Sequence, residues 1–171
     1  MTFPEPILRR AAGVRLVSFD VDGVLTDGKL YYTSAGEEIK AFNVQDGSAI
    51  KLLLGHGVEV AIITGRDSPM VSRRAAELGI PHLFQNVDDK AQALDTLCER
   101  LALRPSEVAH VGDDLPDLAL FAHVGLAIAV PSGHPAALAR AHYVTQLAGG
   151  TGVAREVCEL ILRARGAWAL D

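Results

Sequence analysis

The stretch that decides the fold is Val14-Arg15-Leu16-Val17-Ser18-Phe19-Asp20-Val21-Asp22-Gly23, an apolar run that ends in two acids and a glycine. Its first six residues are predicted to form a buried strand, because short, β-branched apolar runs are typical of parallel sheets covered on both faces. Gly23 lets the backbone turn, so both acids are expected at the carboxyl end of this strand.

Further apolar runs alternate with amphipathic segments along the chain. One helix is expected to open at Ser68-Pro69 and stop at Leu78-Gly79, and another to open at Asp88 and run through Leu101. The alternation predicts an α/β fold with a parallel sheet covered on both faces. The predicted strands are residues 14–19, 58–63, 81–84, 108–111 and 126–130.

One segment interrupts this alternation. Residues 29–33 and 38–43 read as two strands joined by Ser34-Ala35-Gly36-Glu37, which predicts a β-hairpin inserted directly after the first strand, at about residues 28–43. A glycine-rich loop at residues 148–152 is expected to lead into a last helix from Val153 to about Ala167, within a C-terminal segment of residues 148–171.

Composition limits the class of protein. The 171 residues suit a single domain, and 49% hydrophobic with 22% charged residues indicates an ordered chain. The net charge of -5 argues against a nucleic-acid partner. No stretch approaches the ~20 apolar residues that span a membrane. Cys98 and Cys158 are isolated and read as buried thiols, which suits a reducing cytoplasm. A small-molecule partner is therefore expected.

Polar residues follow the predicted strands, where parallel sheets bind ligands. Because the carboxyl ends of parallel strands meet at one edge of a sheet, these acids, hydroxyls and cations are expected to converge there. They are Asp20 and Asp22, Thr64 with Gly65 and Arg66, Lys90, and Asp113 with Asp114 and Asp117.

This set of side chains suits phosphoryl transfer. Crowded carboxylates such as Asp20 and Asp22 call for a cation, and Mg²⁺ is bound by one or two carboxylates together with substrate phosphate. One carboxylate can act as a nucleophile, and the other can protonate the leaving oxygen and then deprotonate water. Thr64 and Lys90 are expected to bind the phosphoryl oxygens.

Other interpretations explain less of the sequence. A calcium loop starting at Asp20 would need an acid or amide, a glycine and a glutamate where the chain has Val24, Leu25 and Tyr31. The metal site of a nucleotide-sugar transferase, or a flavodoxin-like domain with incidental acids, leaves Thr64, Lys90 and Asp113 unexplained. Taken singly, each of these three residues has a common structural explanation, so the prediction depends on their ordered coincidence.

The chain resembles the haloacid dehalogenase superfamily of phosphatases through four segments: residues 19–24, residues 63–66, Lys90 and residues 112–114. The resemblance implies a Rossmann-like, three-layer α/β fold in which Asp20 is the nucleophile and Asp22 the general acid and base. It also implies Mg²⁺ held by Asp20, the Asp22 carbonyl and Asp113. Asp114 and Asp117 would support these ligands.

A closer resemblance, from about Val14 to the last helix, is to the cap-less subfamily of 3-deoxy-D-manno-octulosonate 8-phosphate phosphatases, with the hairpin as its signature. It implies homotetramers in which a neighbouring subunit and a C-terminal tail, here short, close each active site. The implied substrate contacts are Asp22, Asn43, Val44, Gln45, Asp46, Gly47, Lys51, Gly65, Arg66, Arg74 and Lys90.

Gln45 and Lys51 stand where arginine is common in that subfamily, which weakens bidentate recognition of a carboxylate. The resemblance thus implies release of phosphate from 3-deoxy-D-manno-octulosonate 8-phosphate, in lipopolysaccharide biosynthesis. Two alternatives stay open: a phosphatase of a nine-carbon 2-keto-3-deoxy sugar-acid 9-phosphate, and a non-catalytic phosphatase-like assembly module.

Overall fold

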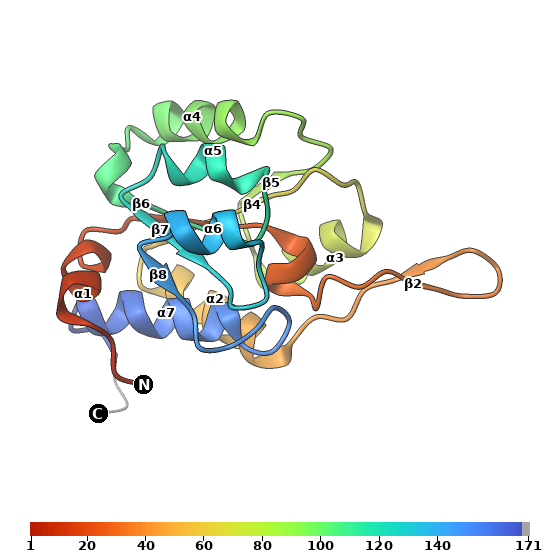
Figure 1. Ribbon diagram of the computed structural model, residues 1–171, viewed down its shortest axis with the longest axis horizontal. Helices are drawn as coiled ribbons and strands as arrows, with labels where there is room; N and C mark the ends of the chain where they lie inside the picture. The colour runs from red at the N-terminus through yellow and green to blue at the C-terminus, as the bar shows by residue number, and fades with distance from the viewer. Residues whose placement is uncertain (169–171) are drawn as a thin grey trace.

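The computed structural model describes residues 1–168 and contains a central parallel sheet (Figure 1). The strand order is β5-β4-β1-β6-β7-β8, and every neighbouring pair in it is parallel. This confirms the predicted fold class. The strands are β1 (Leu16–Phe19), β4 (Glu59–Ile63), β5 (His82–Phe84), β6 (Val108–Gly112), β7 (Leu126–Ala129) and β8 (Tyr143–Val144).

The strand order places a topological switch point beside β1. The chain continues from β1 to β4 and β5 on one side, and then crosses to β6, β7 and β8 on the other side. Open α/β sheets bind ligands in the crevice outside the carboxyl ends of the strands at such a point. The residues that follow β1, β4 and β6 are therefore well placed to form a site.

Helices cover both faces of the sheet and complete the predicted three layers (Figure 1). Val17 and Phe19 face one apolar cluster, whereas Leu16 faces the other, as expected for alternating strand residues. One face carries α1 (Glu5–Ala11), α2 (Val44–Gly55), α3 (Pro69–Leu78) and α7 (Val153–Ala164); the other carries α4 (Lys90–Leu101), α5 (Asp117–Phe121) and α6 (Pro135–Arg140).

The predicted hairpin is present, but it is shorter than expected. It consists of β2 (Tyr31–Tyr32) and β3 (Glu38–Ile39), which pair antiparallel and project from the body of the molecule (Figure 1). The predicted extension of the second strand to Asn43 is wrong, because Asn43 caps α2 and its Oδ1 accepts a hydrogen bond from Gln45 N at 2.7 Å.

Several elements were not predicted: α1, α2, α5, α6 and β8. The five residues of α5 and six of α6 are too few to show a helical period, and α2 contains Gly47, a poor helix former. Two predicted ends also shift. The N-cap of α4 is Asp89 rather than Asp88, and the last helix ends at Ala164 rather than Ala167. The predicted C-terminal segment past 168 lies outside the described residues.

Among the described helices, none has the length and apolar character needed to cross a membrane.

The loop before α7 packs directly onto the turn that follows β1. Gly150 N donates a hydrogen bond to the Val24 carbonyl at 3.0 Å. At Gly149 a methyl group would overlap the carbonyl oxygen of Gly23, so the two backbones approach more closely than any side chain allows. The C-terminal loop therefore supports the turn that carries the first acids of the sequence.

A buried carboxylate holds this loop in place. Glu156 is fully buried, and its two oxygens accept hydrogen bonds from the Tyr143 hydroxyl at 2.7 Å, from Gln146 N at 2.9 Å and from Leu147 N at 3.1 Å. Charge-assisted bonds of this kind are about twice as strong as neutral ones. Glu156 thus joins the start of α7 to β8 and to the loop beyond it.

We predict that Gly149→Ala lowers the free energy of unfolding by about 1–3 kcal/mol, because the added methyl group forces the loop away from the turn after β1. Urea denaturation measures the change. Gly55→Ala is the matched control: no atom lies within 4 Å of a methyl group there, so its effect is expected to stay below about 1 kcal/mol. Equal effects of the two substitutions would contradict the close packing.

Candidate active site

A cleft of about 490 Å³ opens at the carboxyl ends of the central strands. It gathers residues that follow β1, β4 and β6 together with the first residue of α4. The predicted convergence is therefore confirmed for nine site residues: Asp20, Asp22, Thr64, Gly65, Arg66, Lys90, Asp113, Asp114 and Asp117.

Asp20 directly follows β1, and its own N–H donates to the Val111 carbonyl of β6 at 2.9 Å. The chain then enters η1 (Val21–Leu25), a turn whose backbone is not helical at Asp22 and Gly23, and Gly23 has a φ of 93°. A methyl group on Gly23 would collide with the carboxylate of Asp113. A glycine is therefore required at position 23 for two reasons: the backbone there is left-handed, and a side chain would occupy the space of the Asp113 carboxylate.

Lys90 lies between two of the acids. Its ammonium is 2.9 Å from Asp20 Oδ1 and 2.8 Å from Asp117 Oδ1. Burial alone would lower the pKa of Lys90, but the two carboxylates outweigh it and raise that pKa above its usual range. Burial also raises the pKa of Asp20, although Lys90 opposes this shift. Lys90 is thus a permanently charged partner for the Asp20 carboxylate.

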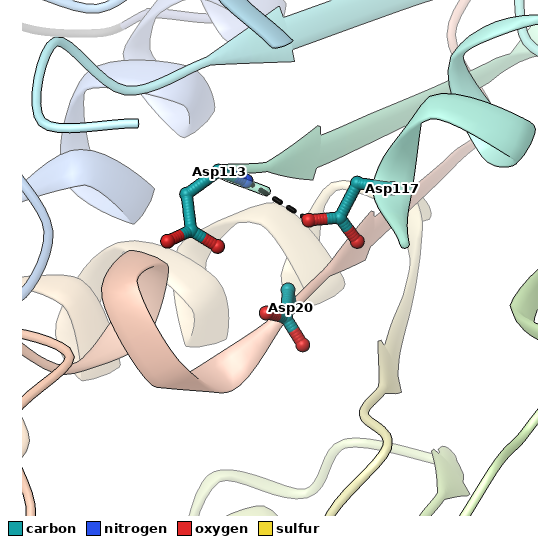
Figure 2. A group of neighbouring side chains, drawn as sticks. All are labelled: Asp20, Asp113 and Asp117. Carbon is teal, nitrogen blue, oxygen red and sulfur yellow. Dashed lines mark hydrogen bonds between the residues drawn. The ribbon is translucent and has the colours of Figure 1, made fainter. Parts of the chain in front are cut away.

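Asp117 uses both of its carboxylate oxygens within the protein. Oδ2 accepts hydrogen bonds from Asp113 N at 2.9 Å, drawn in Figure 2, and from Asp114 N at 3.2 Å. Oδ1 contacts Lys90 and, at 3.2 Å, His110 Nε2. Burial would raise the pKa of Asp117, but these partners hold it well below its usual range. Asp117 is an anchor for its neighbours.

The three acids form a group that suits a divalent cation. Oxygens of Asp20, Asp113 and Asp117 lie within 4.8 Å of one another, and Figure 2 shows the three side chains as neighbours. Burial first, and then the charges of Asp20, Asp117 and Asp114, raise the pKa of Asp113 to about 7. Because the partners of Asp117 occupy it, Asp20 and Asp113 are the carboxylates available to the cation.

The hairpin contacts two residues that line the cleft, which the sequence did not indicate. The Lys40 side chain is 3% exposed and its ammonium forms an ion pair with Asp22 Oδ1. Arg66 Nη2 lies 2.6 Å from Glu38 Oε1, and Arg66 Nε lies 3.6 Å from Asp22 Oδ2. Glu38 and Lys40 are two residues apart, and the period of a strand places such residues on one face. This spacing was the only sign in the sequence that the two side chains act together.

Thr64 follows β4 and is 2% exposed. Its N–H donates to the Phe84 carbonyl at 3.0 Å, and its hydroxyl oxygen accepts from Arg66 N at 3.5 Å. Because the hydroxyl is the acceptor in this second contact, its own proton stays available to donate to a ligand in the cleft.

Comparison with known proteins gives a consistent result. A family model described as haloacid dehalogenase-like hydrolase matches residues 82–157. The 3-deoxy-D-manno-octulosonate 8-phosphate phosphatase KdsC of Escherichia coli (strain K12) is 50% identical over 160 residues, which cover 94% of this chain and 85% of the relative. Identity of this extent is sufficient to assign the family. The chain belongs to the 3-deoxy-D-manno-octulosonate 8-phosphate phosphatase family.

Solved structures of family members superpose closely. The crystal structure from Yersinia pestis is 48% identical, with a TM-score of 0.93, and the match covers 95% of this chain and 88% of that one. The Moraxella catarrhalis enzyme, in complex with a magnesium ion, a phosphate ion and a KDO molecule, is 47% identical, with a TM-score of 0.93 and coverage of 96% and 94%.

Another group of predicted substrate contacts lies outside the lining of the cleft. Within the described chain, Asn43 and Gly47 border a small apolar depression with Arg74, while the Asp46 carboxylate is 3% exposed and accepts from Arg155 N at 2.9 Å. Asp46 therefore serves the N-terminus of α7 and does not face the cleft. Substrate contact by this group stays a prediction; its members are Asn43, Val44, Gln45, Asp46, Gly47, Lys51 and Arg74.

We predict that Mg²⁺ binding weakens as the pH falls through about 7, because protons compete for Asp113. The pKa of Asp113 is ~4 in the unfolded chain and about 7 in the folded protein. Without metal, the free energy of unfolding therefore falls as the pH rises from ~4 to about 7, because Asp113 ionises less readily in the folded protein. The dissociation constant, measured by calorimetry, is expected to be about tenfold larger at pH 6 than at pH 8.

Asp95→Asn, at a half-exposed position away from the cleft, is the control and should keep the same pH dependence. Asp113→Asn should weaken binding at every pH. Equal dissociation constants at pH 6 and pH 8 for the unsubstituted protein would contradict a role for Asp113 as a ligand.

Proposed function

We propose that this chain hydrolyses 3-deoxy-D-manno-octulosonate 8-phosphate to the free sugar acid and phosphate, with Mg²⁺, through an aspartyl-phosphate on Asp20. The observation that carries the proposal is the buried Asp20 carboxylate, held by Lys90 at 2.9 Å beside the Asp113 carboxylate. A carboxylate, a fixed cation and a metal site in one cleft are what transfer of a phosphoryl group to an aspartate requires.

In the first step, a carboxylate oxygen of Asp20 attacks the phosphorus atom and the bond to the sugar oxygen breaks. Asp22 lies two residues further along the same turn and donates a proton to the leaving sugar oxygen. Lys90 holds Asp20 in place, and the Thr64 hydroxyl and the Lys90 ammonium donate hydrogen bonds to the phosphoryl oxygens. The products of this step are the free sugar acid and the aspartyl-phosphate.

In the second step, Asp22, now deprotonated, takes a proton from a water molecule that attacks the phosphorus atom. The bond between phosphorus and the Asp20 oxygen breaks, which releases phosphate and restores both carboxyl groups to their starting states. When bound at Asp20, Asp113 and the Asp22 carbonyl, Mg²⁺ supplies positive charge that offsets the phosphoryl oxygens.

The sugar acid carries a carboxylate, and cations near the cleft suit it. Arg66 lines the cleft, and Arg74 lies half-buried where it donates to the Asn43 carbonyl at 3.2 Å. Lys51 is exposed on α2. These cations would serve an eight-carbon or a nine-carbon acid, so the longer 2-keto-3-deoxy sugar-acid 9-phosphate is the second candidate. Membership of the octulosonate phosphatase family favours the eight-carbon substrate.

We further propose that the protein works as a homotetramer whose neighbouring subunits close the active site. Support comes from the hairpin, which projects from the body (Figure 1) and exposes apolar side chains. A projecting apolar surface is typical of an interface. The exposed apolar residues of the hairpin and its flanks are Leu30, Tyr31, Tyr32, Ile39 and Val44.

The proposed substrate and the two cysteines indicate the cellular setting. Residues 1–171 are proposed to form one phosphatase domain that acts in the cytoplasm, in lipopolysaccharide biosynthesis. Cys98 and Cys158 are both free thiols, which is consistent with a reducing compartment.

We predict that Asp20→Asn lowers kcat by about 10³-fold or more, because an amide oxygen is a poor nucleophile. Phosphate release measures turnover, and light scattering is expected to show an unchanged tetramer. Asp95→Asn is the control and should retain full activity. Near-normal turnover by Asp20→Asn would contradict the covalent mechanism. A folded, Mg²⁺-loaded wild-type protein without any turnover would favour the non-catalytic module.

Substrate choice is tested separately. The wild-type protein is expected to show a kcat/KM at least about tenfold higher for the eight-carbon 8-phosphate than for the nine-carbon 9-phosphate, a difference of ~1.4 kcal/mol in transition-state binding. Steady-state kinetics on both compounds measure this ratio. A clear preference for the longer acid would replace the proposed substrate and leave the chemistry of Asp20 unchanged.

A further inference from the structure

A pair of polar side chains lies buried in the sheet directly behind the active site. Ser18 on β1 and His110 on β6 are register partners in the parallel pairing of these strands, and both are fully buried. Their neighbours along the two strands, such as Val17 and Val111, are apolar core residues. The mechanism proposed above uses neither residue, and burying such groups is unfavourable unless they are hydrogen-bonded.

The hydrogen bonds of this pair define which nitrogen of the ring carries a proton. Ser18 Oγ lies 2.8 Å from His110 Nδ1, and His110 Nε2 lies 3.2 Å from Asp117 Oδ1. A carboxylate can only accept, so Nε2 must bear the hydrogen. The Ser18 hydroxyl contacts the other ring nitrogen, Nδ1, and also lies 3.4 Å from the Ala109 carbonyl oxygen, so both ring nitrogens of His110 have partners. Ser18 thereby also fixes the plane in which the ring lies.

Asp117 transmits this arrangement to the reacting groups. Its Oδ1 accepts hydrogen bonds from His110 Nε2 and from the Lys90 ammonium, and its Oδ2 accepts one from Asp113 N. Lys90 in turn contacts the Asp20 carboxylate. Without a donor at Nε2, Oδ1 of Asp117 would keep only its contact with Lys90, so the carboxylate would be held less firmly against Lys90 and the backbone that carries Asp113.

We propose that His110, oriented by Ser18, is a positioning residue of the phosphatase site. Its Nε2–H group holds the Asp117 carboxylate in place. Asp117 in turn positions Lys90, which contacts the nucleophile Asp20, and the backbone of the metal ligand Asp113. Residues that orient ligands and catalytic groups from behind affect activity or metal affinity by about 10- to 100-fold. The kinetic part of its test rests on the phosphatase activity proposed above.

The test compares two amides that differ only in reach. In His110→Gln the amide nitrogen takes the place of Nε2 and can donate to Asp117, whereas in His110→Asn the shorter amide reaches only the place of Nδ1. We expect His110→Asn to lower kcat by about 10- to 100-fold with a smaller change in KM, and His110→Gln to stay within a few fold of wild type. Equal kcat values for the two folded variants would overturn the proposal.

His82 provides a matched control. Its Nε2 lies 2.9 Å from Glu59 Oε2, a similar histidine–carboxylate pair between β5 and β4 that is not part of the cleft lining. His82→Asn is expected to leave kcat unchanged. His110→Phe, whose ring can pack against Phe121 as the native ring does, is a second variant without a donor and covers the case in which His110→Asn does not fold.

Two readouts do not depend on turnover. Nitrogen NMR of the wild-type ring is expected to show a proton on Nε2 of His110, and a ring with no proton there would overturn the proposal. Calorimetry with Mg²⁺ is expected to show binding about 10-fold or more weaker in His110→Asn than in His110→Gln. If the wild-type protein hydrolyses no sugar-acid phosphate, the proposed function fails, and these two measurements still decide the role of His110.

Discussion

Like charges crowd at one edge of the sheet, and the structure around that edge balances them. Asp20, Asp113 and Asp117 come within 4.8 Å of one another, where burial raises the pKa of Asp20 and of Asp113. Lys90 offsets part of this charge by contacting Asp20 and Asp117. Backbone N–H groups and a histidine complete the coordination of Asp117, which leaves Asp20 and Asp113 for a cation. The electrostatics of the cluster therefore suit a metal ion and a phosphate group.

Close backbone packing brings these acids together. Gly23 leaves room for the Asp113 carboxylate, and Gly149 lets the C-terminal loop press against Gly23. Glu156, buried at the start of α7, fixes that loop through its hydrogen bonds. Segments more than a hundred residues apart thus support the turn after β1, so changes near α7 are expected to affect both the stability of the fold and the geometry of the cleft.

The hairpin has a second structural role besides the proposed association. Its residues Lys40 and Glu38 form ion pairs with Asp22 and Arg66, which line the cleft. A short insertion therefore contributes charged groups beside the proposed acid and base. Because the strands and flanks of the same hairpin expose apolar side chains, the proposed assembly of subunits and the arrangement of the cleft would be connected through one small element.

The sequence by itself determined the parallel sheet, the acids after β1 and β6, and the convergence of Thr64 and Lys90 with them, because local apolar runs set the strands and parallel strands end at one edge. It did not determine the contact of Lys40 with Asp22, nor the pairing of Ser18 with His110 across 92 residues. Which strands become neighbours, and in what register, depends on packing between distant segments, and no local pattern of residues encodes it.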